Sequence, residues 1–345
     1  MSKRLGETEI HWVRSEGIDE RLARWLERKG VASRIVRDEP LSRRSSLRIG
    51  GPARRWVEVG ELEDLFSLLA AICDEPFFCV GLGSNTLFPD EGIDEPVIRL
   101  VDEMAGWTIE PMDDGQRARV RVRAGAINAH LVRGLLKEGW VGAEFLSLIP
   151  GTFGGAVALN AGTKEKELAA ILEDVWLAIP DGANSRWKVE RKTPGEIDLS
   201  YRHAELPGGA LVIGGTVIVE RGDVESAKEL VRADKERRNR TQPYRLASVG
   251  STFANPDGDY AGRLIEEAGL KGKKIGGAMI SELHANFFIN ADDASAEDFL
   301  SLMALARHRV KQKFGVSLRP EVRFVGFDGR ARMRDLERKL DDRDV

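Results

Sequence analysis

A long uncharged stretch, Phe145 to Thr163, is rich in residues that bring a backbone close to a ligand. It holds nineteen residues and no charge, although 31% of the residues in the protein are charged. Such a length and neutrality would suit a membrane span. The stretch also contains residues that break helices or compete for backbone hydrogen bonds, and these argue against a membrane span. They are Pro150, Gly151, Gly154, Gly155, Gly162, Ser147, Thr152 and Asn160. The stretch therefore indicates backbone packed against a large non-protein group. A buried turn between core strands is the alternative, and it explains one or two glycines better than four.

A second glycine loop, Gly81-Leu82-Gly83-Ser84-Asn85, follows a short apolar segment. Successive backbone N–H groups in such a turn can bind an anion, and the last two residues add polar side chains. A simple turn is the more common outcome of this pattern. The loop is not the dinucleotide fingerprint GxGxxG, because no helix pattern follows it directly. This argues against a Rossmann fold.

The remaining candidates for chemistry are isolated polar residues in otherwise structural surroundings: Tyr201, Arg202, Ser251, Asn255 and Glu321. Each also has a structural explanation, such as capping a turn for Ser251 or a surface ion pair for Glu321. The chain has no GxSxG motif and no His/Cys spacing typical of a metal site, so we expect neither a Ser-His-Asp hydrolase nor a metal. From the residues alone, the sequence indicates a cofactor- or nucleotide-binding α+β enzyme.

The elements that must position these residues alternate between strands and helices. Helical periodicity predicts helices at 18–26, 61–73, 127–138, 224–240 and 295–314, the last with a capping box of Ser295 and Asp298. Apolar or alternating runs predict strands at 56–59, 77–80 (buried), 97–100, 117–124 (half-exposed), 175–179, 211–220 and 320–324. We expect the final residues to form a charged tail, helical or loose. The alternation is typical of an α/β or α+β protein.

Composition limits the class of protein further. A chain of 345 residues is long for one core, so two or three domains are expected. The net charge of −4 argues against nucleic acid as the main partner. The two cysteines, Cys73 and Cys79, and a start without the apolar core of a signal peptide indicate a reducing, cytoplasmic setting with no membrane association. The sequence does not predict the oligomeric state.

Eight segments in order resemble the UDP-N-acetylenolpyruvoylglucosamine reductase (MurB) family over roughly residues 41–326. They are RIGGPA, GLGSN, LIPGTFGGAVALNAG, SYRHAEL, RRNRTQP, GSTFANP, AGRLIEEAGLKGKKIGGAMISELHANFFIN and PEVRFVG. The resemblance implies an α+β protein, with an FAD-binding domain of the vanillyl-alcohol-oxidase/PCMH type and a C-terminal α+β substrate-binding domain. It looks like the family's shorter form, which lacks a substrate-covering tyrosine loop. The implied division is an N-terminal extension (1–40), an FAD-binding domain (41–222, lobes 41–103 and 104–222), a substrate-binding domain (223–326) and a charged tail (327–345).

The resemblance also implies a role for each candidate residue. FAD would be bound by Arg48, Ile49, Gly50, Gly81, Leu82, Gly83, Ser84, Asn85, Gly151, Thr152, Gly154, Gly155, Asn160, Ala161 and Gly162. Ser251 would donate a proton, with Arg202 and Glu321 around the substrate carboxylate and enol. Substrate or flavin contacts of second rank would come from Tyr201, Arg238, Gln242, Asn255 and Arg323. The glycine loop has no histidine, which favours non-covalent FAD.

The implied activity is that of a UDP-N-acetylmuramate dehydrogenase in peptidoglycan precursor synthesis. NADPH reduces FAD, and the reduced flavin delivers hydride to the enolpyruvyl ether of the sugar nucleotide. The sequence departs from the family pattern at Leu82, where many relatives have glycine, at 163–166, and before Ser251, where a proline is common. An FAD-dependent oxidase of the same fold family, acting on another small molecule, is the alternative. A non-catalytic nucleotide-binding or assembly protein is a third possibility.

Overall fold

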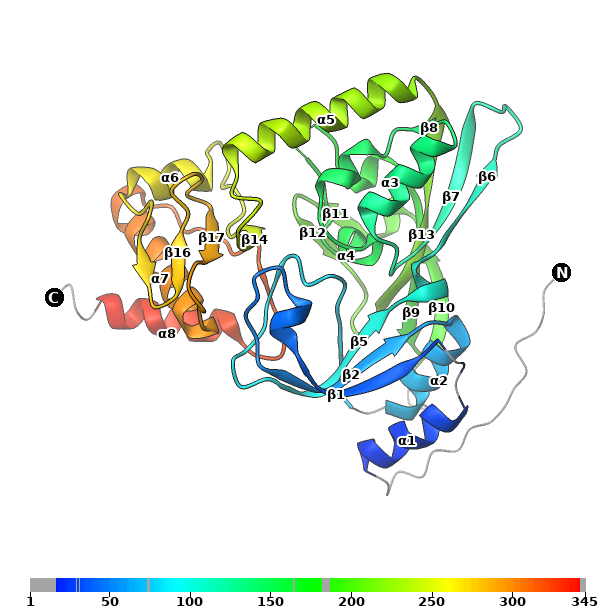
Figure 1. Ribbon diagram of the computed structural model, residues 1–345, viewed down its shortest axis with the longest axis horizontal. Helices are drawn as coiled ribbons and strands as arrows, with labels where there is room; N and C mark the ends of the chain where they lie inside the picture. The colour runs from blue at the N-terminus through cyan, green and yellow to red at the C-terminus, as the bar shows by residue number, and fades with distance from the viewer. Residues whose placement is uncertain are drawn as a thin grey trace.

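The structure, a computed structural model, describes residues 17–28, 30, 32–72, 75–163, 165–181 and 187–341. Figure 1 shows two α/β lobes next to each other, the long helix α5 (Val224–Thr241) along one side, and a C-terminal unit beyond the end of that helix. Among the described residues, no helix is both long and apolar enough to cross a membrane.

The first lobe is a four-stranded sheet covered by two helices. Its strands, in spatial order, are β1 (Arg34–Pro40), β2 (Pro52–Val59), β5 (Ile93–Leu100) and β3 (Phe78–Cys79). Helix α1 (Ile18–Arg28) packs on α2 (Leu62–Ile72) through the predicted apolar stripe, with Leu22 and Trp25 fully buried. Because β1 pairs with β2, residues that we expected in an N-terminal extension form the edge of this sheet.

The strand predicted to be buried at 77–80 is shorter and more exposed than expected. Only Phe78 and Cys79 form β3, and Cys79 is exposed. The prediction of burial was wrong because β3 is an edge strand, paired with β5 on one side only.

The second lobe is a six-stranded antiparallel sheet. Its strands are β6 (Trp107–Pro111), β7 (Arg117–Arg123), β8 (Trp140–Val141), β9 (Leu172–Pro180), β10 (Trp187–Lys192) and β13 (Leu211–Arg221). Strand β7 buries Ala118, Val120 and Val122 and exposes the intervening arginines, as predicted. Helices α3 (Asn128–Lys137) and α4 (Phe153–Ala158) and the hairpin β11 (Asp198–Ser200)–β12 (His203–Glu205) complete the lobe. One hydrophobic core extends through both lobes.

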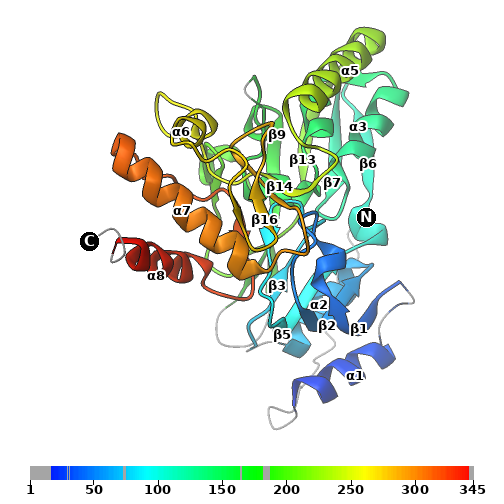
Figure 2. The same ribbon diagram turned by 60° about the vertical axis from the view of Figure 1, so that its left-hand side comes forward.

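The C-terminal unit has a core of its own. Its elements are β14 (Ala247–Ser251), α6 (Ala261–Glu267), β15 (Lys274–Ile275), β16 (Ala278–Ile280), β17 (Phe287–Asn290), α7 (Ala296–Phe314), β18 (Arg323–Phe324) and α8 (Gly329–Asp341). The predicted capping box of Ser295 and Asp298 begins α7, and Gly315 ends it with φ of +72°. The charged tail is helical: Figure 2 shows α8 alongside α7, where Met333 is fully buried.

Residues 85–91, which we call the linking segment, join the first lobe to the C-terminal unit. Its strand β4 (Thr86–Leu87) pairs in parallel with β18. The Asp90 carboxylate accepts a hydrogen bond from the Ala296 N–H at the start of α7 (2.8 Å), and Glu91 pairs with Arg332 of α8. Three side chains from residues 41–103, Leu47, Ile49 and Leu87, lie in the core of the C-terminal unit.

Candidate active site

The two glycine-rich loops predicted from the sequence face each other across the lobes. Ser84 Oγ donates a hydrogen bond to the Pro150 carbonyl (2.6 Å). A methyl group at Gly81 would lie 2.5 Å from Thr152 Oγ1, so a larger residue at Gly81 would collide with the second loop. The long neutral stretch contains the helix α4, capped by the Thr152 hydroxyl. Its glycines exclude a membrane span but allow this short helix.

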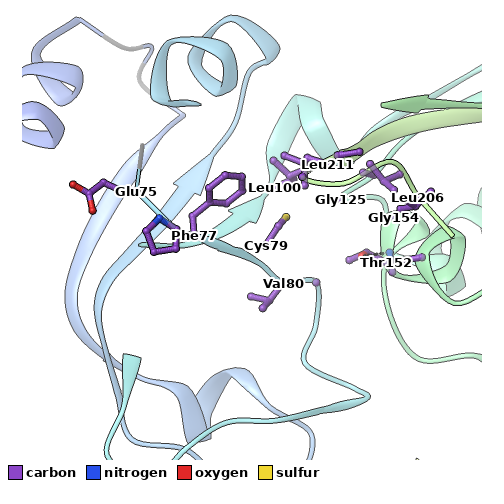
Figure 3. A pocket seen from close by; sticks show the side chains of 18 residues that line it. Glu75, Phe77, Cys79, Val80, Leu100, Gly125, Thr152, Gly154, Leu206 and Leu211 are labelled. Atoms are coloured by element: carbon purple, nitrogen blue, oxygen red, sulfur yellow. Dashed lines mark hydrogen bonds between the residues drawn. The ribbon is translucent and has the colours of Figure 1, made fainter. Parts of the chain in front are cut away.

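A cavity of about 520 Å³ opens between the lobes, beside the two loops. Figure 3 shows Phe77, Cys79 and Val80 of the first lobe on one side, with Thr152 and Gly154 of the second lobe opposite. The eighteen lining residues include four of the predicted cofactor-binding residues, namely Gly81, Thr152, Gly154 and Gly155. Glu75 is the one charged residue in this lining, and it is paired with Arg21 of α1 (2.7 Å).

The structure brings two of the three predicted catalytic side chains into contact. Arg202 Nε lies 3.2 Å from Glu321 Oε1, and both side chains are 17% exposed. Arg202 occupies the turn between β11 and β12, with φ of +57°. Its Nη2 donates to the Gly162 carbonyl (2.8 Å), whereas Nη1 is buried and donates no hydrogen bond within the described residues. The guanidinium is therefore fixed in place, with its permanent positive charge beside Glu321.

Burial raises the pKa of Glu321 above its ordinary value, although the charges of Arg202, Arg319 and Arg323 act in the opposite direction. Desolvation disfavours the charged carboxylate, so Glu321 holds a proton more readily than an exposed glutamate does. Its backbone is fixed from two sides. Its N–H donates to the Thr252 carbonyl (2.9 Å), and its carbonyl accepts from Asn85 Nδ2 (3.0 Å).

Ser251, the third predicted catalytic residue, is the last residue of β14 and is half-buried. It follows Gly250, which has φ of +77°, and precedes Thr252, whose carbonyl accepts from Glu321. A register shift between β14 and β17 lies immediately before it. The irregular end of this strand therefore places Ser251 next in sequence to the residue that holds Glu321.

Other predicted residues direct their side chains to neighbours within the protein. The Asn160 side chain bonds to Glu167 (2.9 Å) and to the backbone of Ala169 and Ser200. Asn255 accepts from the Ala261 N–H (3.0 Å), at the start of α6. Ile49 and Ala161 have their side chains in hydrophobic cores, so only their backbones are available to a ligand.

The last predicted residues lie around the loops and the ion pair. Arg238 of α5 donates to the Leu148 carbonyl (2.7 Å) and to the Tyr244 hydroxyl (2.9 Å), while Gln242 caps α5. Tyr201 is exposed, with the Arg202 guanidinium over its ring at 4.9 Å. The Arg323 N–H donates to the Asn85 carbonyl. The Asn290 amide donates hydrogen bonds to the carbonyls of Leu47 and Arg48. The backbone of Gly50 has a φ of +134°.

Comparison with known proteins accounts for both halves of the chain. Residues 53–183 match the model of an FAD binding domain, and residues 242–325 match that of the UDP-N-acetylenolpyruvoylglucosamine reductase C-terminal domain. The chain is 42% identical to the UDP-N-acetylenolpyruvoylglucosamine reductase of Anaeromyxobacter sp. (strain Fw109-5), over 87% of this chain and 91% of that protein. The chain belongs to the UDP-N-acetylenolpyruvoylglucosamine reductase family. The resemblance inferred from the eight sequence segments is thereby confirmed.

Further relatives agree with this membership. The family member from Methylococcus capsulatus is 41% identical over 84% of this chain and 92% of its own length. The crystal structure of the Thermus caldophilus reductase superposes with a TM-score of 0.70, at 34% identity, and covers 85% of this chain and 99% of that one. The predicted fold class, an FAD-binding domain followed by the reductase's C-terminal domain, is confirmed, and the protein is an oxidoreductase with FAD as its cofactor.

The residues of the cavity fit this cofactor. Its wall is formed largely by glycines and apolar side chains, and a methyl group added at Gly155 would meet only Thr152 Oγ1, at 3.6 Å, an ordinary van der Waals contact. Two glycine-rich loops beside it offer backbone N–H groups of the kind that bind a pyrophosphate. Sequence reasoning missed several lining residues, among them Phe77, Cys79, Leu206 and Leu211. Their apolar types are ordinary for a core, so no local pattern distinguished them.

Proposed function

We propose that the protein reduces the enolpyruvyl ether of UDP-N-acetylglucosamine-enolpyruvate to UDP-N-acetylmuramate, with NADPH as reductant. The substrate would be a small sugar nucleotide, and the setting the cytoplasm. We assign FAD binding, non-covalent, to residues 41–222 and substrate binding to 223–326. The observation that carries the proposal is the Arg202–Glu321 pair, built from the two domains beside the strand that ends at Ser251.

The flavin, when bound and reduced by NADPH, would supply the hydride that adds to the methylene carbon of the enolpyruvyl group. The addition places negative charge on the substrate carboxylate and its α-carbon. Arg202 is suited to stabilise that charge, because its guanidinium is permanently charged and is already fixed by the Gly162 carbonyl and Glu321. Losing a preorganised donor of this kind typically costs about 10²–10³-fold in rate.

Ser251 is the proposed proton donor to the α-carbon. A neutral serine is a weak acid, but the enol-like carbon is strongly basic, and proton transfer of this type contributes about 10²–10⁴-fold. A protonated Glu321 would not oppose the charge that develops on the substrate, which agrees with the raised pKa of this carboxyl.

The test measures FAD binding and its reduction by NADPH separately from reoxidation of the flavin by the substrate. Ser251→Ala should bind FAD and be reduced by NADPH as the wild type is, but reoxidation by the enolpyruvyl nucleotide should fall about 10²–10⁴-fold. Ser248→Ala is a matched control on the same strand, because Ser248 contacts Ser46 through its backbone carbonyl. Stopped-flow absorbance of the flavin measures both half-reactions. Normal reoxidation of Ser251→Ala would contradict the proton-donor role, and no response of the wild type to this nucleotide would contradict the proposed function.

A further inference from the structure

Arg202 has a second carboxylate partner, Glu167, that the proposed reaction does not use. Glu167 Oε1 lies 3.6 Å from Arg202 Nη1, on the side of the guanidinium away from the Nε that meets Glu321. The Glu167 side chain is 33% exposed, about twice as much as either of the other two. Arg202 is therefore shared between two carboxylates from different parts of the chain.

Glu167 is held in this position by its own neighbours. Asn160 Nδ2 donates to Glu167 Oε2 (2.9 Å), and Asn160 is 2% exposed, with φ of +39°. Residues 162 and 167 form an antiparallel bridge, and the Gly162 carbonyl accepts from Arg202 Nη2. The same small loop thus fixes both the carboxylate and the guanidinium, and a fixed carboxylate competes for the arginine more effectively than a mobile one.

We propose that Glu167 is a positioning residue for the reaction proposed above: it draws part of the Arg202 charge away from Glu321, so that Glu321 can hold its proton. The inference rests on the proposed function. The charged groups that face Glu321 are Arg202 from the β11–β12 turn and Arg319 and Arg323 from its own segment, while Asn85 of the linking segment is neutral. Glu167 is the acidic group that offsets one of these three cations.

When Glu167 loses its charge, the Arg202 guanidinium loses one of its two carboxylate partners and becomes free to stabilise an ionised Glu321. Glu167→Gln should therefore lower the pKa of Glu321, by roughly one unit for a neighbour acting partly through another residue. The amide oxygen of the new side chain can still accept from Asn160 Nδ2, while its NH₂ group then faces Arg202 Nη1 and cannot accept from it.

The experiment uses the FAD-loaded enzyme and two readouts. Carbon-13 NMR of the glutamate carboxyls, assigned with Glu321→Gln, follows the titration of Glu321 without substrate. The pH profile of flavin reoxidation by the enolpyruvyl nucleotide reports the same group during turnover. In Glu167→Gln both midpoints should move down by roughly one pH unit. Glu165→Gln, on the same loop and exposed, should leave both unchanged.

Each outcome bears on the proposed role of Glu167 or on the proposed function. A midpoint that stays at the wild-type value in a folded, yellow Glu167→Gln protein would overturn the inference. If that variant does not fold, Glu167→Asp retains the charge but withdraws it by one methylene, and it should shift the NMR midpoint in the same direction by less; no shift there would also overturn it. Failure of the wild type to reduce the nucleotide contradicts the proposed function, whereas the NMR titration still decides the role of Glu167.

Discussion

Gly155 offers the most direct test of where FAD lies. It is the third residue of α4 and lines the cavity between the lobes. It is not among the glycines with positive φ, and the nearest atom to an added methyl group is Thr152 Oγ1 at 3.6 Å, an ordinary van der Waals contact. Nothing in the described protein therefore requires glycine at this position.

The expected effects on stability and on cofactor binding have opposite signs. Alanine is favoured over glycine within a helix by about 1 kcal/mol, so Gly155→Ala should stabilise the apoprotein by up to that amount. The same methyl group enters the space where FAD is expected. An extra methyl group in a packed site costs about 1–3 kcal/mol, which corresponds to FAD binding roughly 5- to 150-fold weaker.

Gly154→Ala is the matched control, one residue earlier in the same helix. Its methyl group would lie 2.8 Å from Ala124 Cβ and 3.1 Å from the Ala124 carbonyl oxygen, so this variant should destabilise the apoprotein. Urea unfolding of the deflavinated proteins gives the first quantity, and flavin fluorescence during titration with FAD gives the second. If Gly155→Ala binds FAD as tightly as the wild type, or its apoprotein is less stable, the assignment of this cavity is wrong.

Three further predictions concern the C-terminal unit. The pKa of Glu321 is raised on folding, so its contribution to stability is complete below the ordinary glutamate pKa and is lost as the pH rises through the folded value; Glu321→Gln should therefore gain stability relative to the wild type as the pH rises above the ordinary glutamate pKa in urea unfolding, by about 1.4 kcal/mol for each unit of the shift. Asp90→Ala removes the carboxylate that accepts from the Ala296 N–H and should cost about 1 kcal/mol, while Asp90→Asn should cost less; equal losses in chemical denaturation would refute a capping role. Met333→Ala removes a fully buried side chain and should cost about 2–5 kcal/mol, whereas a thermal midpoint equal to that of the wild type would show that α8 contributes nothing to the core.

Local patterns predicted the elements better than they predicted the contacts among functional residues. The capping box at Ser295 and the alternation in β7 depend on neighbours within a few residues, and both were found as expected. The length of β3 depended on its place at a sheet edge, which no local pattern reveals.

The resemblance named Arg202 and Glu321 together, but their contact joins residues more than a hundred positions apart. The bond from Asn85 to the Glu321 carbonyl spans 236 positions, and the Glu167–Arg202 contact joins two different loops. Asn85 is an example: in the sequence it completes a glycine loop, and in the structure its amide donates to the Glu321 carbonyl. Only the folded chain shows whether such a side chain faces a ligand or bonds to another part of the protein.

The linking segment also affects how the protein is made. Asn85 and its partner Glu321 are separated by 236 residues. At a synthesis rate of about 5–20 residues per second, the ribosome reaches Glu321 roughly 12 to 47 seconds after Asn85. During that interval Leu47, Ile49 and Leu87 have no core to enter, since that core is built by residues made later. The loop that ends at Asn85 therefore gains its bond to Glu321 only late in translation, and a nascent chain interrupted before β18 exposes apolar side chains that chaperones recognise.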